Sequence, residues 1–479
     1  MHDESRRLEY IDGMRGLAIL MVIACHYLPN AADYTFTQEL GIFKMMLLYS
    51  TNLAWTGVDL FFVISGFLIG GILMRNRESS NFFNVFYVRR FFRIVPAYLI
   101  WLAILAAGLA GILPVHEVFE NNFPLWAHLT FTQNLLTTST GTFGSIWEIV
   151  TWSLAVEEQF YLVLPLMIWL LPGRLLVVAS LACIVAAPLV RIGLYLFLDT
   201  PDMAAYTLFP ARMDCLFLGV VIAAAVGNER ARAALTGAAG HLKVLLCALS
   251  VVMALLLFSN WHKTNVWMAT GGYTAIAAFY GTALTLAALD RLPGAKLLGL
   301  LPLRLAGAWC FSLYLFHVPV HFFVWEGWEY ALGRPSNAQN LLVIALSIGL
   351  SMVVSAVLMR FVEGPAIRFA SRFKYDRPGR NGGVVPNCPE SPLPVQVLTE
   401  RTLAEQAVEA RIQAAQNVVS QSVAEQIRTV QMLASQITDP QTSRSADCSR
   451  EIPATGTPAT AGLDGPDLAG QPLAGPSPA

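Results

Sequence analysis

The sequence predicts an all-α membrane protein, a bundle of about ten transmembrane helices followed by a largely disordered tail. Three observations support this. Of the 479 residues, 55% are hydrophobic and 13% are charged, whereas about a quarter of the residues of a soluble domain are charged. Long apolar stretches recur along residues 1–375, each close to the roughly 20 residues that a helix needs to cross a bilayer. After residue 376 the composition shifts to Pro, Gly, Ser, Gln and Ala, which does not sustain a packed core.

The candidate spans follow one another with short connections. The fourth and fifth are separated only by Pro172, Gly173 and Arg174, a break that predicts a tight helical hairpin. The first apolar run also fits a cleaved signal peptide. It carries Cys25 and His26, however, and many spans follow it, which favours a permanent helix. In all, about ten spans begin near Gly16, Ala54, Ile94, Trp152, Leu175, Met213, Lys243, Val266, Leu305 and Leu341.

Basic residues gather at the ends of spans that share one side of the membrane. Because cytoplasmic loops of membrane proteins are enriched in Lys and Arg, both termini are predicted to be cytoplasmic. The longest opposite loop, residues 113–148, is rich in Thr, Asn and aromatic residues, which suits a segment at the outer interface. The basic residues are Arg6, Arg7, Arg15, Arg75, Arg77, Arg89, Arg90, Arg93, Arg174, Arg230, Arg232, Lys243, Arg291, Lys296, Arg304, Arg360, Arg368, Arg372 and Lys374.

The composition divides the chain into a membrane domain, residues 1–375, and a cytoplasmic tail, residues 376–479. Most of the tail is predicted to be disordered. Residues 398–437 are the exception, because apolar residues there recur at the intervals of a helix. The apolar stripe is narrow and interrupted by Gln and Ser, which favours a solvent-exposed helix over an assembly coil.

Charge and motif content argue against several classes of function. Lys plus Arg number 31 and Asp plus Glu number 32, so the chain lacks the basic excess of a nucleic-acid-binding protein. The 7 cysteines are scattered through the sequence without a CxxC pair or ligand spacing. No HExxH, P-loop or dinucleotide-binding fingerprint occurs. We therefore expect no metal and no nucleic-acid partner.

Ionisable residues inside the predicted spans are the strongest candidates for function, because an ionised side chain is costly within a bilayer. The predicted topology sorts them into two groups. Acidic residues and histidines lie toward the outer side: His26, Asp59, Glu157, Glu158, Asp214 and His317. Arginines and one glutamate lie at the cytoplasmic ends: Arg15, Arg90, Arg93 and Glu363.

Two spacings among these residues suit an anionic substrate. Arg15 and His26 are 11 residues apart, which returns to within about 20° of the same helix face and separates them by about 16 Å along the axis. An anion held at Arg15 could therefore extend toward His26. Arg90 and Arg93 share a helix face, which suits phosphate groups. The same spacings also fit interfacial anchors and a hydrogen-bonded core histidine.

Glu157 and Glu158 form an acidic pair within an apolar helix. Adjacent positions diverge by about 100°, so at most one faces a given partner. Tyr161 lies over Glu158 on the next turn and is expected to pack against the site. Packing alone does not explain two buried acids, so we expect a functional or network role. Ser153 lacks a GxSxG context, and capping of the helix start explains it better than a nucleophile does.

Taken together, these segments resemble the acyltransferase-3 family of bacterial membrane O-acyltransferases. Arg15 and His26 match its pattern of an Arg, ten residues and a His, and Arg90 and Arg93 match its RxxR motif. Each motif alone is weak, but their order over residues 10–373 is specific. The other matching segments are Tyr10–Ala18, Gly57–Phe67, Trp152–Tyr161, Arg212–Asp214, Ser312–His317 and Val362–Pro365.

The resemblance implies a helical bundle in the bacterial inner membrane in which His26 is essential. It also implies acetyl-CoA or a related acyl-CoA as donor, and as acceptor a hydroxyl of a glycan, oligosaccharide or lipid-linked sugar. His26 would act as a general base or take the acyl group itself, with Glu157 or Glu158 orienting the imidazole. The donor phosphates would bind Arg15, Arg90 and Arg93. The expected substrate or polar network comprises Asp59, Tyr161, Arg212, Asp214, His317 and Glu363.

Many members of that family carry a fused SGNH hydrolase-like domain after the last span, whereas residues 376–479 lack a GDS motif and the apolar sequence for one. Two other classes of protein stay open. Buried His, Asp and Glu also describe a proton-coupled secondary transporter, although no segment in the second half repeats the region around His26. A non-catalytic membrane scaffold that presents the tail is the third alternative.

Overall fold

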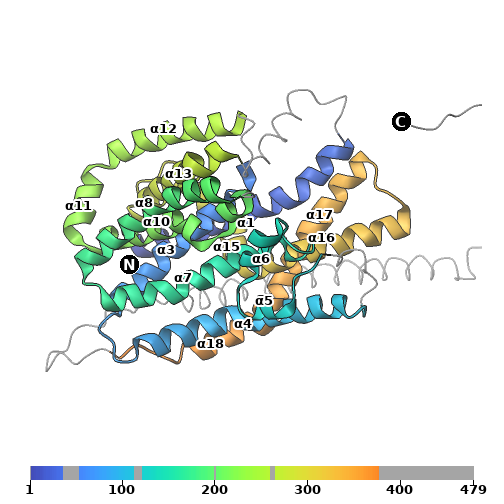
Figure 1. Cartoon of the computed structure of the whole chain (residues 1–479), viewed down its shortest axis with the longest axis horizontal. Coiled ribbons are helices and arrows are strands. Elements are labelled where there is room, and N and C mark those ends of the chain that lie inside the picture. Colours follow the sequence, from blue (N-terminus) through green and yellow to red (C-terminus); the bar gives the residue numbers. More distant parts are fainter. Residues whose placement is uncertain (1, 36–52, 113–120, 199–200, 259–264, 377–479) are drawn as a thin grey trace, which may run out of the picture. The chain divides into compact units, whose positions relative to one another are not determined.

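The computed structural model describes residues 2–35, 53–112, 121–198, 201–258 and 265–376, all within one compact unit, Met1–Val384 (Figure 1). All regular structure in these ranges is helical, which confirms the predicted all-α fold. The helices are α1 (His2–Thr35), α3 (Gly57–Arg75), α4 (Phe82–Leu109), α5 (Leu125–Leu129), α6 (Gln133–Thr140), η2 (Glu148–Val150), α7 (Thr151–Leu170), α8 (Gly173–Phe197), α9 (Pro201–Thr207), η3 (Phe209–Arg212), α10 (Met213–Gly227), α11 (Glu229–Gly237), α12 (Ala239–Phe258), η4 (Met268–Gly272), α13 (Tyr273–Ala288), α14 (Ala295–Leu298), α15 (Leu301–Ala308), α16 (Cys310–Leu332), α17 (Asn337–Leu358), η5 (Met359–Glu363) and α18 (Gly364–Ala370).

The described helices support a multi-pass membrane protein. By length and composition, 8 of them could cross a membrane, or 9 if the bent pair of α15 and α16 is one span. The span predicted to begin near Val266 is not among them. Residues 266–288 are nevertheless helical without a break, through the π-helical turn η4 and then α13, but Gly, Thr and Tyr residues make this stretch less apolar than a typical span.

The structure describes one of the predicted boundaries, the break between the fourth and fifth spans, and leaves parts of other predicted segments undescribed. α7 ends at Leu170 and α8 begins at Gly173 after Pro172, where the sequence predicts the helical break. Of the predicted outer loop, residues 113–120 lie outside the described residues. The tail helix predicted for 398–437 lies outside them as well, so it stays a prediction.

Glycines let α1 and α15 pack in backbone contact. A Cβ on Gly16 would lie 1.9 Å from the Leu303 carbonyl oxygen, and one on Gly307 would lie 1.9 Å from the Asp12 carbonyl oxygen. A side chain at either position would require backbone movement, so this close packing depends on glycine. The chain bends by 84° between α15 and α16. The first residue of α16 thereby contacts Arg15 of α1.

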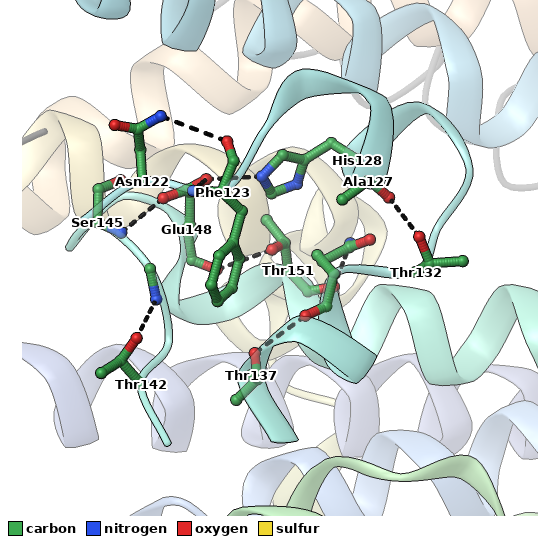
Figure 2. Close-up of polar contacts among 12 residues, drawn as sticks. Asn122, Phe123, Ala127, His128, Thr132, Thr137, Thr142, Ser145, Glu148 and Thr151 are labelled. Carbon is green, nitrogen blue, oxygen red and sulfur yellow. Dashed lines mark hydrogen bonds and ion pairs between the residues drawn. The ribbon is translucent and has the colours of Figure 1, made fainter. Parts of the chain in front are cut away.

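Glu148 holds together residues 121–150, the described part of the chain that leads into α7. Its Oε1 accepts hydrogen bonds from the Phe123 amide (3.0 Å) and His128 Nε2 (2.7 Å), and its Oε2 accepts one from the Ser145 amide (2.5 Å; Figure 2). His128 and Glu148 are both fully buried. The His128 carbonyl also accepts a hydrogen bond from the Tyr98 hydroxyl of α4 (3.1 Å). This segment is therefore fixed against the bundle.

Candidate active site

Two histidines from distant parts of the chain meet at the candidate site. His26 of α1 and His317 of α16 are 291 residues apart in sequence, yet His26 Nδ1 lies 3.1 Å from His317 Nε2. The ring centroids are 5.0 Å apart. His317 is fully buried and His26 is partly exposed. The sequence analysis named both residues as candidates but did not predict their contact.

His26 borders a pocket whose walls are largely aromatic. The Trp152 and Tyr206 rings pack with centroids 4.5 Å apart. The Tyr314 hydroxyl donates to the Val150 carbonyl (2.8 Å) and hydrogen-bonds with Ser153, which fixes α16 against the start of α7. Burial raises the pKa of the Tyr206 phenol well above its usual range, so this wall stays neutral. The lining residues are Val22, Cys25, His26, Trp55, Val58, Phe143, Ile149, Val150, Trp152, Tyr206 and Tyr314.

Arg15 shares the continuous helix α1 with His26, as predicted, but its guanidinium is already engaged. Nη1 lies 3.3 Å from Asp12 Oδ1, and Nη2 donates to Cys310 Sγ at 3.0 Å. The rise of an α-helix places Arg15 about 16 Å from His26 along the axis. Arg15 therefore lies away from the aromatic pocket, and its role in anion binding stays a prediction.

The two arginines of the RxxR motif have different surroundings. Arg93 Nη1 lies 3.2 Å from Glu363 Oε2, and the other Glu363 oxygen accepts a hydrogen bond from Ser312. This chain of contacts connects α4, η5 and α16. Arg90 makes no ion pair within the described residues, and its guanidinium carbon lies 5.5 Å from the Tyr161 ring centroid. The charge of Arg90 also acts on the buried Glu158 carboxylate, although the two groups do not form an ion pair.

Glu157 and Glu158 have separate environments, in keeping with their adjacent helix positions. Glu157 Oε1 accepts hydrogen bonds from Ser65 of α3 and from Tyr161 (3.0 Å). Glu158 Oε1 is buried and has no hydrogen-bond partner in the described part of the chain. Neither carboxylate hydrogen-bonds to His26 there, so their proposed role in orienting the imidazole stays a prediction.

A buried ionic network adjoins the pocket at Tyr206. Arg212 pairs with Asp59, and its guanidinium carbon lies 5.7 Å from the Tyr206 ring centroid. Arg191 Nη2 lies 2.8 Å from Asp214 Oδ2. All four charged side chains are fully buried. Two acids and two arginines balance one another, which suits a structural network better than an anion site.

Two buried residues with polar partners, Arg191 and His128, were not among the candidates predicted from the sequence. Arg191 lies inside the predicted fifth span, where an ionisable residue is itself a signal. His128 lies in the short helix α5, 20 residues before its partner Glu148, and no periodic pattern connects them. In the described ranges, no group of three or more His, Cys, Asp or Glu side chains is arranged to hold a metal ion.

The arrangement around His26 suits proton transfer. An imidazole that borders a pocket can take a proton from a hydroxyl group that enters it. Comparison with known proteins then identifies the family, because a model described as an acyltransferase domain matches residues 8–360. The chain belongs to this acyltransferase family. The match includes both His26 and His317, it confirms the resemblance seen in the sequence, and it favours an acyltransferase over the transporter and scaffold alternatives.

Individual relatives agree with the family. The chain is similar to the O-acetyltransferase OatA of Staphylococcus aureus strain NCTC 8325 / PS 47, with 25% identity over 360 residues. The aligned region is 71% of this chain and 57% of that relative. A putative O-acetyltransferase of S. aureus strain COL is 25% identical over 361 residues, again 71% of this chain and 57% of the relative. The chain thus spans little more than half the length of these relatives. No solved structure matches it.

Proposed function

We propose that this protein is a membrane O-acyltransferase, most simply an O-acetyltransferase. It would transfer the acyl group from acyl-CoA to a hydroxyl of a cell-surface or secreted glycan or glycolipid. The observation that carries the proposal is the placement of His26 at an aromatic pocket, on a membrane helix of an acyltransferase-family chain. The names of the relatives support the transfer of acetyl to oxygen.

His26 serves as the general base in this proposal. Its imidazole takes the proton from the acceptor hydroxyl while the hydroxyl oxygen attacks the thioester carbonyl carbon. The carbon–sulfur bond then breaks, and the imidazolium returns the proton to the departing thiolate. The products are an ester and the free CoA thiol, and His26 ends as it began.

The walls of the pocket favour a sugar as the acceptor. Trp55, Trp152 and Tyr206 line the pocket beside His26, and each is otherwise buried. One face of a pyranose ring carries mainly C–H groups, which pack well against aromatic side chains, while its hydroxyls point outward toward polar partners. The pocket is small, so the acceptor would enter it with the edge that bears the reacting hydroxyl, which would then face the imidazole. The wall residues in the described part of the chain contribute no carboxylate or ammonium group, which suits a neutral acceptor.

The ends of the spans that lie away from the His26 pocket suit the acyl-CoA donor. Arg15, Arg90 and Arg93 lie at the predicted cytoplasmic ends of their spans, where CoA is available. Arg90, which makes no ion pair among the described residues, is the first candidate for a phosphate contact. The proposed enzyme is then a multi-pass protein of the bacterial inner membrane, with both termini in the cytoplasm and the acceptor approaching from the other side.

Mass spectrometry of envelope and secreted glycans tests the function in cells. We expect a mass increase of one acyl unit when the wild-type protein is expressed and its loss in His26→Gln. His241→Gln is the matched control, because His241 is exposed on α12. An acyl modification that persists in a correctly inserted His26→Gln variant would refute the proposal.

A further inference from the structure

The direction of the hydrogen bond between the two histidines follows from the surroundings of His317. Its Nδ1 lies 3.0 Å from the Leu313 carbonyl oxygen and 2.9 Å from the Tyr314 carbonyl oxygen. Carbonyl oxygens only accept hydrogen bonds, so Nδ1 carries the hydrogen. In a neutral imidazole the other nitrogen, Nε2, then has a lone pair. His317 therefore presents an acceptor to His26.

His26 must be the donor in this bond. Its Nδ1 lies 3.1 Å from His317 Nε2 and 2.9 Å from the Val22 carbonyl oxygen, and both of these atoms are acceptors. The hydrogen of neutral His26 is therefore on Nδ1, and Nε2 is the nitrogen that can take a proton. The Val22 carbonyl lies one turn earlier on α1, where it also accepts the backbone hydrogen bond of the helix. The His26 side chain therefore shares the Val22 carbonyl with the helix backbone, whereas it does not share the acceptor nitrogen of His317 with the backbone.

His317 is itself held firmly. Its carbonyl oxygen accepts a hydrogen bond from the Tyr27 hydroxyl (2.7 Å), and the Tyr27 oxygen lies 3.1 Å from Ser351 Oγ. Tyr27 follows His26 directly on α1, and Ser351 belongs to α17. Three helices are thus connected at the level of the two histidines. Since His317 and Tyr27 are both fully buried, the acceptor nitrogen has a fixed position.

We propose that His317 is a positioning residue for the acyl transfer. It accepts the Nδ1 hydrogen of His26 and so keeps His26 Nε2 unprotonated and available to the acceptor hydroxyl. When Nε2 takes the proton, the Nδ1 hydrogen bond to His317 remains and stabilises the imidazolium. A carboxylate has this role in the Ser-His-Asp triad, whereas here a neutral imidazole has it. The inference rests on the proposed function, in which His26 is the base.

Two variants of His317 separate positioning from packing. His317→Leu fills the site without an acceptor, and we expect kcat to fall by about tenfold or more, as for other residues that orient a reacting group. The KM for acyl-CoA should stay within about twofold, because the loss falls on the chemical step. In His317→Gln the amide oxygen lies near the former Nε2 and should restore most of kcat. Wild-type kcat in His317→Leu would overturn the inference.

Nitrogen NMR of the full-length protein in lipid, labelled with 15N-histidine, reads the tautomer without any substrate. The His26 signals are assigned by their loss in His26→Gln. We expect a protonated Nδ1 and an unprotonated Nε2 in the wild type, and a mixture of tautomers in His317→Leu. A hydrogen on Nε2 of wild-type His26 would contradict the positioning role, even if His26→Gln is inactive. Full acylation by His26→Gln would instead contradict the proposed function and leave the tautomer result intact.

Discussion

Glu148→Gln is expected to loosen the segment 121–150 and to destabilise the protein. The carboxylate accepts three hydrogen bonds, from the Phe123 amide, His128 Nε2 and the Ser145 amide (Figure 2). The amide of Gln has one accepting oxygen, so its NH2 group must face at least one of these donors. Because Glu148 is 1% exposed, water cannot satisfy the donor that is left.

The magnitude follows from the contacts. A hydrogen bond to a charged group contributes about 1.5–3 kcal/mol, and a buried polar group left unsatisfied costs about 1–3 kcal/mol. Added together, the two ranges predict that the free energy of unfolding falls by about 2.5–6 kcal/mol. The pocket should change as well, because Ile149 and Val150 directly follow Glu148 and line it. The KM for the acceptor should therefore rise more than the KM for acyl-CoA.

Thermal unfolding of the detergent-solubilised protein measures the effect. We expect an apparent Tm at least about 5 °C below that of the wild type, since each 1 kcal/mol shifts the Tm of a large domain by a few degrees. Glu326→Gln is the matched control, because Glu326 is exposed on α16 and its substitution should leave Tm nearly unchanged. Equal Tm values for Glu148→Gln and the wild type would refute the account of this segment.

Three further substitutions test other parts of the structure. Gly16→Ala should lower the folded yield and Tm because its Cβ would meet a carbonyl of α15, while Gly193→Ala, with no atom within 4 Å, should be neutral or stabilising by up to about 1 kcal/mol. Arg191→Leu leaves the buried carboxylate of Asp214 without its ion pair and should lower the unfolding free energy by about 3–5 kcal/mol in the same melting assay. Arg90→Gln should raise the KM for acyl-CoA by about tenfold in a radiolabel assay, and an unchanged KM would argue against a phosphate contact.

Most of the fold could be predicted because membrane spans have a simple sequence signature. Long apolar runs and Pro172 located the helices and the break between α7 and α8. The stretch that begins near Val266 is helical as well, but its Gly, Thr and Tyr residues make it less apolar than a typical span. Burial of a charged side chain in a membrane span is costly, so ionisable residues such as Asp59 and Asp214 could be predicted as candidates from the sequence. Their ion-pair partners could not be predicted in this way.

Which residues contact one another depends on the tertiary structure. The sequence predicted these contacts least well. The contact between His26 and His317 joins the first span to the ninth predicted span, and no spacing along the chain encodes it. Arg93 was expected to hold phosphate, yet it pairs with Glu363 from η5. Likewise, Glu148 of η2 and His128 of α5 belong to short helices that no periodic sequence pattern connects. The chemical type of each candidate site could be predicted from the residue and its depth within the predicted span. The neighbours of each residue could be identified only from the folded structure.

Acyl transfer by the purified protein tests whether His26 is the general base of a membrane O-acyltransferase. The full-length chain, reconstituted in lipid vesicles, is given radiolabelled acetyl-CoA and a hydroxyl-bearing oligosaccharide, and label in the oligosaccharide is counted. If His26 is the general base, the wild type and His241→Gln should both transfer label. Transfer by His26→Gln should be slower by about 100-fold or more, the usual contribution of a general base. Transfer by His26→Gln at the wild-type rate would contradict this role.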